Sequence, residues 1–314
     1  MTSTGFTHLR PRLGRHSSLG FREGASMDPI SRSIEGPGAL GVLSLDQPGA
    51  VLMCFDADSH PPIDPIAGGA LDHGSVILHP EDGSEMRAFQ AVPAQPTGAG
   101  ILILPDVRGL HPFFEELALR FAERGVAAVA IDYFSRTAGT GARDGDFDYG
   151  PHLAQTSWEG LSADVRAGAV QLRSIQPSPR SIFVTGFCMG GRLASDATTL
   201  GLGFAGAIPF YGWPVGPHRS GMPAPADLAA EIECPILCIY GGADQGITAQ
   251  VRDEYDEALD RARVDHRTLV YDGAPHSFFD RKAEEFQGAS DAAWDETLAF
   301  IRKHTAGQPI AATA

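Results

Sequence analysis

The sequence has few cysteines, an excess of negative charge and no long apolar run. Its four cysteines, among 314 residues, show no pairing framework, which favours a reducing compartment. The formal net charge of −15 excludes a generally basic nucleic-acid surface and disfavours an anionic membrane as a partner. No apolar run approaches the ~18 residues that span a bilayer, and the N-terminus lacks the apolar core of a signal peptide. These absences predict a cytoplasmic protein.

The composition predicts one large globular domain with flanking segments. Hydrophobic residues make up 43% of the chain and charged residues 20%, which is enough apolar material for a sizeable core. Residues 1–50 are rich in Gly, Ser, Pro and Arg and are predicted to be a flexible extension, whereas 51–74 is a proline-rich extended segment. We expect a single domain over 75–305 and a short tail over 306–314.

Within that domain, segments of strand character alternate with segments of helical periodicity. Such alternation indicates βα units, and so an α/β fold with a doubly wound, mostly parallel sheet and helices on both faces. The predicted strands are 75–80, 86–94, 98–106, 126–134, 181–186, 204–212, 234–242 and 266–273. The predicted helices are 112–125, 161–176, 190–200, 248–264 and 290–304.

Three chemically capable residues follow predicted strands, where sheets of this kind place their active sites. Cys188 lies in "GFCMGG", Asp244 in "YGGADQG" and His276 in "APHSFF". Nucleophile, acid and histidine in that chain order are the pattern of an α/β-hydrolase triad. Taken singly, the residues have ordinary alternatives: a buried core cysteine, a turn aspartate and a capping or core histidine. The ordered set favours catalysis.

The spacing Gly-x-Cys-x-Gly fits a nucleophile elbow, in which a tight strand-to-helix turn exposes the nucleophile. A cysteine there lies at a helix N-terminus, where the helix dipole favours a thiolate. His276 would take the thiol proton, and Asp244 would fix the imidazole tautomer. The backbone N–H of Met189, directly after the nucleophile, is the first expected oxyanion-hole donor.

Five segments together resemble the dienelactone hydrolase (carboxymethylenebutenolidase) family of the α/β-hydrolase fold. They are "LPDVRGLHPFFEELALRFAERG", "AIDYFSR", "GFCMGGRLA", "YGGADQG" and "PHSF", and they cover roughly residues 75–304 in order. The resemblance implies that Cys188, His276 and Asp244 open a small lactone through an acyl-enzyme, without a cofactor or a metal. It also implies that the Val107 N–H is the second oxyanion-hole donor.

The resemblance further suggests residues around the triad, each with a structural alternative. Asp106 matches the acidic residue that modulates the nucleophile, although the family enzyme has a glutamate there and a turn aspartate is equally compatible. Arg136 matches one arginine that binds a substrate carboxylate. The second arginine is displaced by one position to Arg281, because Asp280 stands where the family has arginine. Tyr211 follows a strand and either lines the pocket or serves packing.

The leading prediction is a cysteine hydrolase of small lactones or activated esters, with a small-molecule substrate and neither nucleic acid nor membrane as partner. A broader carboxylesterase for small acyl esters is the first alternative. A redox-sensing thiol protein on the same fold is an alternative of another class, because a thiol at an elbow can oxidise instead of turning over substrate. The intact Asp244 and His276 argue against it, since a sensor needs no acyl-transfer triad.

Overall fold

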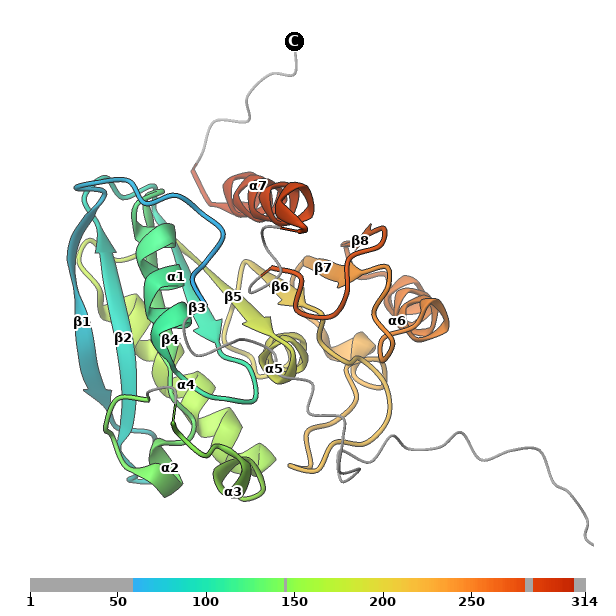
Figure 1. Cartoon of the computed structure of the whole chain (residues 1–314), viewed down its shortest axis with the longest axis horizontal. Coiled ribbons are helices and arrows are strands. Elements are labelled where there is room, and N and C mark those ends of the chain that lie inside the picture. Colours follow the sequence, from blue (N-terminus) through green and yellow to red (C-terminus); the bar gives the residue numbers. More distant parts are fainter. Residues whose placement is uncertain (1–58, 144–145, 280–284, 308–314) are drawn as a thin grey trace, which may run out of the picture. The chain divides into compact units, whose positions relative to one another are not determined.

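The computed structural model describes residues 59–143, 146–279 and 285–307 (Figure 1). The predicted flexible extension over 1–50, residues 51–58 of the proline-rich segment and the tail beyond residue 307 lie outside these residues. Residues 59–69 contain neither helix nor strand. None of the described helices is both long and apolar enough to cross a membrane.

The described residues form one eight-stranded sheet in the order β1-β2-β4-β3-β5-β6-β7-β8. The pairs β1–β2 and β2–β4 are antiparallel, and every other pair is parallel. The predicted mostly parallel sheet is therefore confirmed. The strands are β1 (Ala70–Leu78), β2 (Met86–Pro93), β3 (Ala99–Leu104), β4 (Val126–Ile131), β5 (Ser181–Phe187), β6 (Gly206–Phe210), β7 (Ile236–Gly241) and β8 (His266–Tyr271).

Helices cover both faces of this sheet (Figure 1). The longer ones are α1 (Pro112–Ala122), α4 (Trp158–Ser174), α5 (Met189–Ala197), α6 (Ala249–Ala262) and α7 (Gln287–His304). Phe183 of β5 contacts Phe300 of α7, and Leu102 of β3 packs against Gly168 of α4. Leu102 pairs with the residue after Phe183. Because successive side chains of a strand point to opposite faces, α4 and α7 lie on opposite sides of the sheet.

The central strands β3, β4 and β5 have every residue buried. Strands covered on both faces carry continuous apolar runs rather than alternating ones, which is why the sequence pattern found them. Their carboxyl ends point to the same edge of the sheet, and the loops that follow them there carry Asp106, Asp132 and Cys188.

Several local features differ from the sequence prediction. The first strand begins at Ala70 rather than at residue 75, so it extends into the segment expected to be irregular. The short helices α2 (Ser135–Ala138) and α3 (Gly150–Leu153) and the 3₁₀ turn η1 (Ala229–Glu231) were not predicted, because a single helical turn has no periodicity to detect. Helix α4 begins three residues earlier than predicted, since the Ser157 hydroxyl caps it by accepting a hydrogen bond from the Gly160 N–H at 3.2 Å.

Asp196 on α5 is a buried carboxyl group with consequences for stability. It has no solvent exposure, and neither of its carboxyl oxygens has a hydrogen-bond partner among the described residues. Burial raises the pKa of Asp196 to about 8 from a usual value of 3.8, although the positive charge of Arg192 opposes the shift. Between pH 3.8 and about 8, the folded protein therefore keeps the carboxyl proton of Asp196, whereas the unfolded chain has lost it.

We expect the free energy of unfolding to fall as pH rises between the two values, by up to ~1.4 kcal/mol per pH unit. The Asp196→Asn variant, which cannot ionise, should lose most of this slope in urea titrations between pH 5 and about 8. Exposed Asp253 on α6 supplies the control, because Asp253→Asn removes one carboxylate without touching a buried group. An unchanged slope in Asp196→Asn would show that Asp196 is not the source of the pH dependence.

Candidate active site

Cys188 lies on the tight turn between β5 and α5. Its backbone has φ 56° and ψ −113°, a left-handed conformation that residues with a Cβ rarely adopt and that marks a strained functional turn. The Cys188 N–H donates to the Phe210 carbonyl at 3.1 Å, and the Cys188 carbonyl accepts from the Arg192 N–H at 3.1 Å. These two bonds hold a half-buried thiol at the N-terminus of α5.

The two flanking glycines are required because the backbones approach each other with no room for a side chain. A Cβ at Gly186 would overlap the Gly190 carbonyl, and a Cβ at Gly190 would overlap the carbonyl oxygens of Leu104 and Pro105. Larger residues would push α5 away from β5 and from the loop after β3. The predicted elbow is therefore present, for the steric reason that its sequence implied.

Asp244 and His276 are already paired. The His276 Nδ1 lies 2.7 Å from Asp244 Oδ2, and Asp244 Oδ1 accepts hydrogen bonds from the N–H groups of Gly246 at 2.8 Å and Ile247 at 3.0 Å. Burial favours the neutral acid, but the bond and charge of His276 and the two N–H donors outweigh it, so the pKa of Asp244 lies below its usual value. An ionised Asp244 holds His276 by Nδ1, which leaves Nε2 as the ring nitrogen for proton transfer.

Cys188 is in no disulfide bond, and none of the hydrogen bonds found among the described residues involves its thiol. In the same part of the chain, the N–H groups of Val107 and Met189 donate no backbone hydrogen bond. Both therefore have the donor capacity that an oxyanion hole requires.

Asp106 lies wholly buried in the loop after β3. Its Oδ1 accepts from the Arg108 N–H at 2.8 Å and lies 3.8 Å from His111 Nε2, while its Oδ2 has no hydrogen-bond partner within the described residues. The hydrogen bond from the Arg108 N–H forms an Asx-type turn, which explains the conformation of Asp106. The turn does not explain why the second carboxylate oxygen, Oδ2, is buried without a hydrogen-bond partner among the described residues. Its predicted action on the thiol stays a prediction.

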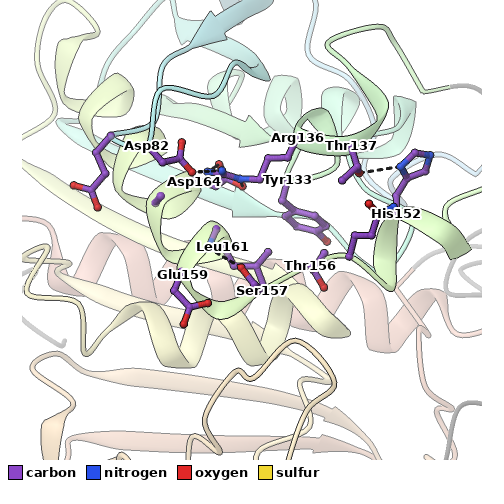
Figure 2. Close-up of a pocket in the computed structure, with 14 residues that line it drawn as sticks. Asp82, Tyr133, Arg136, Thr137, His152, Thr156, Ser157, Glu159, Leu161 and Asp164 are labelled. Atoms are coloured by element: carbon purple, nitrogen blue, oxygen red, sulfur yellow. Dashed lines mark hydrogen bonds and ion pairs between the residues drawn. The ribbon is translucent and has the colours of Figure 1, made fainter.

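Arg136 follows β4 and lines a cavity of about 370 Å³. Figure 2 shows its guanidinium between two carboxylates: Asp164 accepts from Nε at 3.1 Å and from Nη2 at 2.7 Å, and Asp82 accepts from Nη1. Cys188, Asp244 and His276 are not part of the cavity wall. Tyr133 is part of the cavity wall. Its hydroxyl donates hydrogen bonds to the carbonyls of Pro105 and Asp106, and so connects the cavity with the loop beside the elbow.

The two remaining predicted substrate contacts have different outcomes. Tyr211 is fully buried, and its ring centroid lies 4.9 Å from that of His276, so the structure shows it packing against the base. A direct contact with substrate stays a prediction for Tyr211. Arg281 lies outside the described residues. Cys234 and Cys238 are buried free cysteines.

Arg192, on the helix that follows the nucleophile, was not singled out by the sequence. It is almost fully buried and its guanidinium donates to carbonyl oxygens of one loop, those of Trp213, Val215, Gly216, Met222 and Pro223. This arginine ties the loop after β6 to the nucleophile helix. The detectable signal was its position in "GGRLAS", since a charged residue in an otherwise small and apolar helix start indicates a buried polar role.

No group of three or more His, Cys, Asp or Glu side chains that could hold a metal ion occurs within residues 59–143, 146–279 and 285–307.

The sheet order and the glycine-flanked elbow define the α/β-hydrolase class. The family model described as "Dienelactone hydrolase family" matches residues 86–305. The chain therefore belongs to the dienelactone hydrolase family, and the resemblance found in the sequence is confirmed.

Individual relatives agree with this membership. The chain is 29% identical over 219 residues to a Methylorubrum extorquens protein named "Putative carboxymethylenebutenolidase", covering 65% of this chain and 72% of that one. It is 25% identical over 230 residues to a Yersinia pestis protein of the same name, covering 72% and 86% of the two chains. Among solved structures, a Klebsiella pneumoniae protein described as "Putative Dienelactone Hydrolase" matches with a TM-score of 0.64 at 22% identity, covering 73% of this chain and 98% of that one. At that identity the structural match supports the fold alone.

Proposed function

We propose that this dienelactone hydrolase-family protein is a cysteine hydrolase that opens small lactones or activated esters through Cys188, His276 and Asp244. The observation that supports it best is the placement of Cys188, on a strained, glycine-flanked elbow at a helix N-terminus, in a chain whose Asp244 and His276 are already paired at 2.7 Å. A thiol that only senses oxidants needs neither the elbow nor an oriented imidazole.

In the proposed mechanism, His276 Nε2 removes the proton of the Cys188 thiol. The thiolate attacks the ester carbonyl, and the N–H groups of Val107 and Met189 stabilise the negative oxygen that develops. The C–O bond to the leaving group then breaks, and His276 gives its proton to that oxygen or, when the group leaves as a stable anion, to solvent. Water, deprotonated by His276, attacks the thioester, releases the acid and restores the thiol.

The surrounding residues have supporting roles in this proposal. Tyr211 limits the tilt of the His276 ring through the contact between their rings. Asp106, in the loop after β3, modulates the thiol. Arg136 helps to form the wall of the cavity that would accept part of the substrate.

Mapping the acyl-enzyme tests the proposal. Wild-type protein mixed with p-nitrophenyl acetate, quenched in acid, digested and examined by mass spectrometry should carry an acetyl group on the peptide that contains Cys188. The adduct should build up within the first turnovers and disappear as substrate is exhausted.

Two other thiols provide an internal control. Cys234 and Cys238 are buried, and desolvation raises the pKa of each to about 12, so neither should be acylated. Turnover of the ester with no adduct on Cys188, or with the adduct on another residue, would contradict the mechanism. Oxidation of Cys188 in a protein that hydrolyses nothing would favour the redox-sensing alternative instead.

A further inference from the structure

The Arg136 guanidinium is shared by two carboxylates. Three of its five N–H donors are used: Nε and Nη2 bind the two oxygens of Asp164 at 3.1 and 2.7 Å, and Nη1 binds Asp82 (Figure 2). The paired geometry with Asp164 is the fork arrangement in which an arginine holds a carboxylate most firmly. The positive charge of Arg136 is thus shared by the negative charges of Asp82 and Asp164, and the net charge of the three side chains is −1.

Neither Asp82 nor Asp164 can easily break its ion pair with Arg136. The Asp164 side chain on α4 has no solvent exposure, so turning away from Arg136 would leave a buried charge without a partner. Asp82 is 42% exposed, but Ser84 donates to it through both its hydroxyl and its N–H. The hydrogen bonds from Ser84 and Arg136 lower the pKa of Asp82 to about 2, so it remains charged across the neutral range.

The cavity that Arg136 lines has an acidic wall. Glu81 and Glu159 line the same space of about 370 Å³ as Asp82 and Asp164, and Arg136 is the only arginine or lysine in its wall, which consists of described residues. A carboxylate entering the cavity would meet like charge from four side chains and an arginine already in use. The remaining wall, which includes Thr137, His152, Thr156 and Leu161, offers hydroxyl, imidazole and apolar surface to an uncharged group.

We propose that the ion-pair set Asp82–Arg136–Asp164 makes this enzyme discriminate against carboxylate-bearing substrates, so that its substrates are uncharged small esters or lactones. This inference rests on the proposed hydrolase function, and it names the substrate class for that site. Tyr133 provides the connection, because it lines the cavity and its hydroxyl binds the carbonyls of Pro105 and Asp106 in the loop that carries the Val107 N–H. Arg136 in this arrangement organises the cavity wall and does not bind a substrate anion.

The test compares two esters of similar chain length, p-nitrophenyl butyrate and mono-p-nitrophenyl glutarate, which differ by one carboxylate. The assay is run above the pKa of Asp164, which burial raises to about 6. The measured quantity is the ratio of kcat/KM for the glutarate ester to that for the butyrate ester. Wild type should give a ratio below about 0.1, and Asp82→Asn, which releases Arg136 from its exposed partner, should raise it roughly tenfold.

Glu296→Gln is the matched control. Glu296 accepts two hydrogen bonds at 2.8 Å from Arg267, at a partly exposed position away from the cavity wall. This variant changes the net charge by the same amount and also frees an arginine, so its ratio should stay within about twofold of wild type. Circular dichroism and thermal unfolding of both variants establish that they are folded.

The outcomes separate the two levels of the proposal. A wild-type ratio near or above one, an unchanged ratio in Asp82→Asn, or an equal rise in Glu296→Gln would each overturn the discrimination while leaving the hydrolase function in place. Hydrolysis of neither ester, together with no acylation of Cys188, would instead overturn the hydrolase function itself.

Discussion

Replacing Cys188 with alanine is expected to lower kcat/KM for p-nitrophenyl acetate by at least about 10³-fold. The thiol is the only group that the proposed mechanism uses as nucleophile. Alanine keeps a Cβ, so it carries the same backbone strain at φ 56° as cysteine does. The thiol makes no hydrogen bond within the described residues, so the free energy of unfolding should change by no more than ~1 kcal/mol.

Cys188→Ala should therefore fail in the ester assay while unfolding in urea much as wild type does. Cys234→Ala provides the matched control, because it removes one buried thiol that lies just before β7 and outside the elbow. That variant should keep its turnover even if it loses some stability to a cavity. Undiminished hydrolysis by Cys188→Ala would remove Cys188 from the mechanism.

The Asp244→Asn variant should lose about 10³- to 10⁴-fold in kcat with little change in fold. The asparagine oxygen can keep the backbone hydrogen bonds from Gly246 and Ile247, which directs the amide NH₂ toward His276. An NH₂ donor binds the imidazole only when Nδ1 is unprotonated, and the ring proton then resides on Nε2. In that tautomer the histidine cannot accept the proton of the Cys188 thiol.

Asp272→Asn is the control for this change. Asp272 lies exposed directly after β8, so the variant removes one negative charge near the same edge of the sheet without altering the Asp–His pair. Its kcat should match that of wild type. If Asp244→Asn also matched wild type, the 2.7 Å pair would be a structural hydrogen bond and the base would have to be sought elsewhere.

Much of the fold could be predicted from the sequence because a strand that is buried on both faces has a continuous apolar run. The six strands that pair in parallel and the longer helices lie where the pattern predicted them, with ends shifted by a few residues. The early start of β1 at Ala70 could not be predicted, since an edge strand paired on one side follows its antiparallel partner rather than an apolar pattern. The single-turn helices α2 and α3 were missed for lack of periodicity.

The triad candidates were accessible to sequence reasoning because their chemistry depends on order and on glycine spacing, and both are visible in a linear string. The ion pairs of Arg136 with Asp82 and Asp164 could not be predicted from the sequence. Its partners lie 54 residues before it and 28 residues after it in the chain, and nothing local to "DYFSR" indicates them. The partners of Arg192 could not be predicted either, since they are backbone carbonyls, which have no sequence signature.

The close approach of Gly190 to the carbonyls of Leu104 and Pro105 has an evolutionary consequence. With no side chain between them, the spacing of the nucleophile helix from the β3 loop is set by main-chain contact, and no rotamer choice can alter it. Mutations in the cavity wall can then accumulate and change which molecules are accepted, while the reacting geometry is inherited unchanged. A family built in this way can diversify its substrates one side chain at a time.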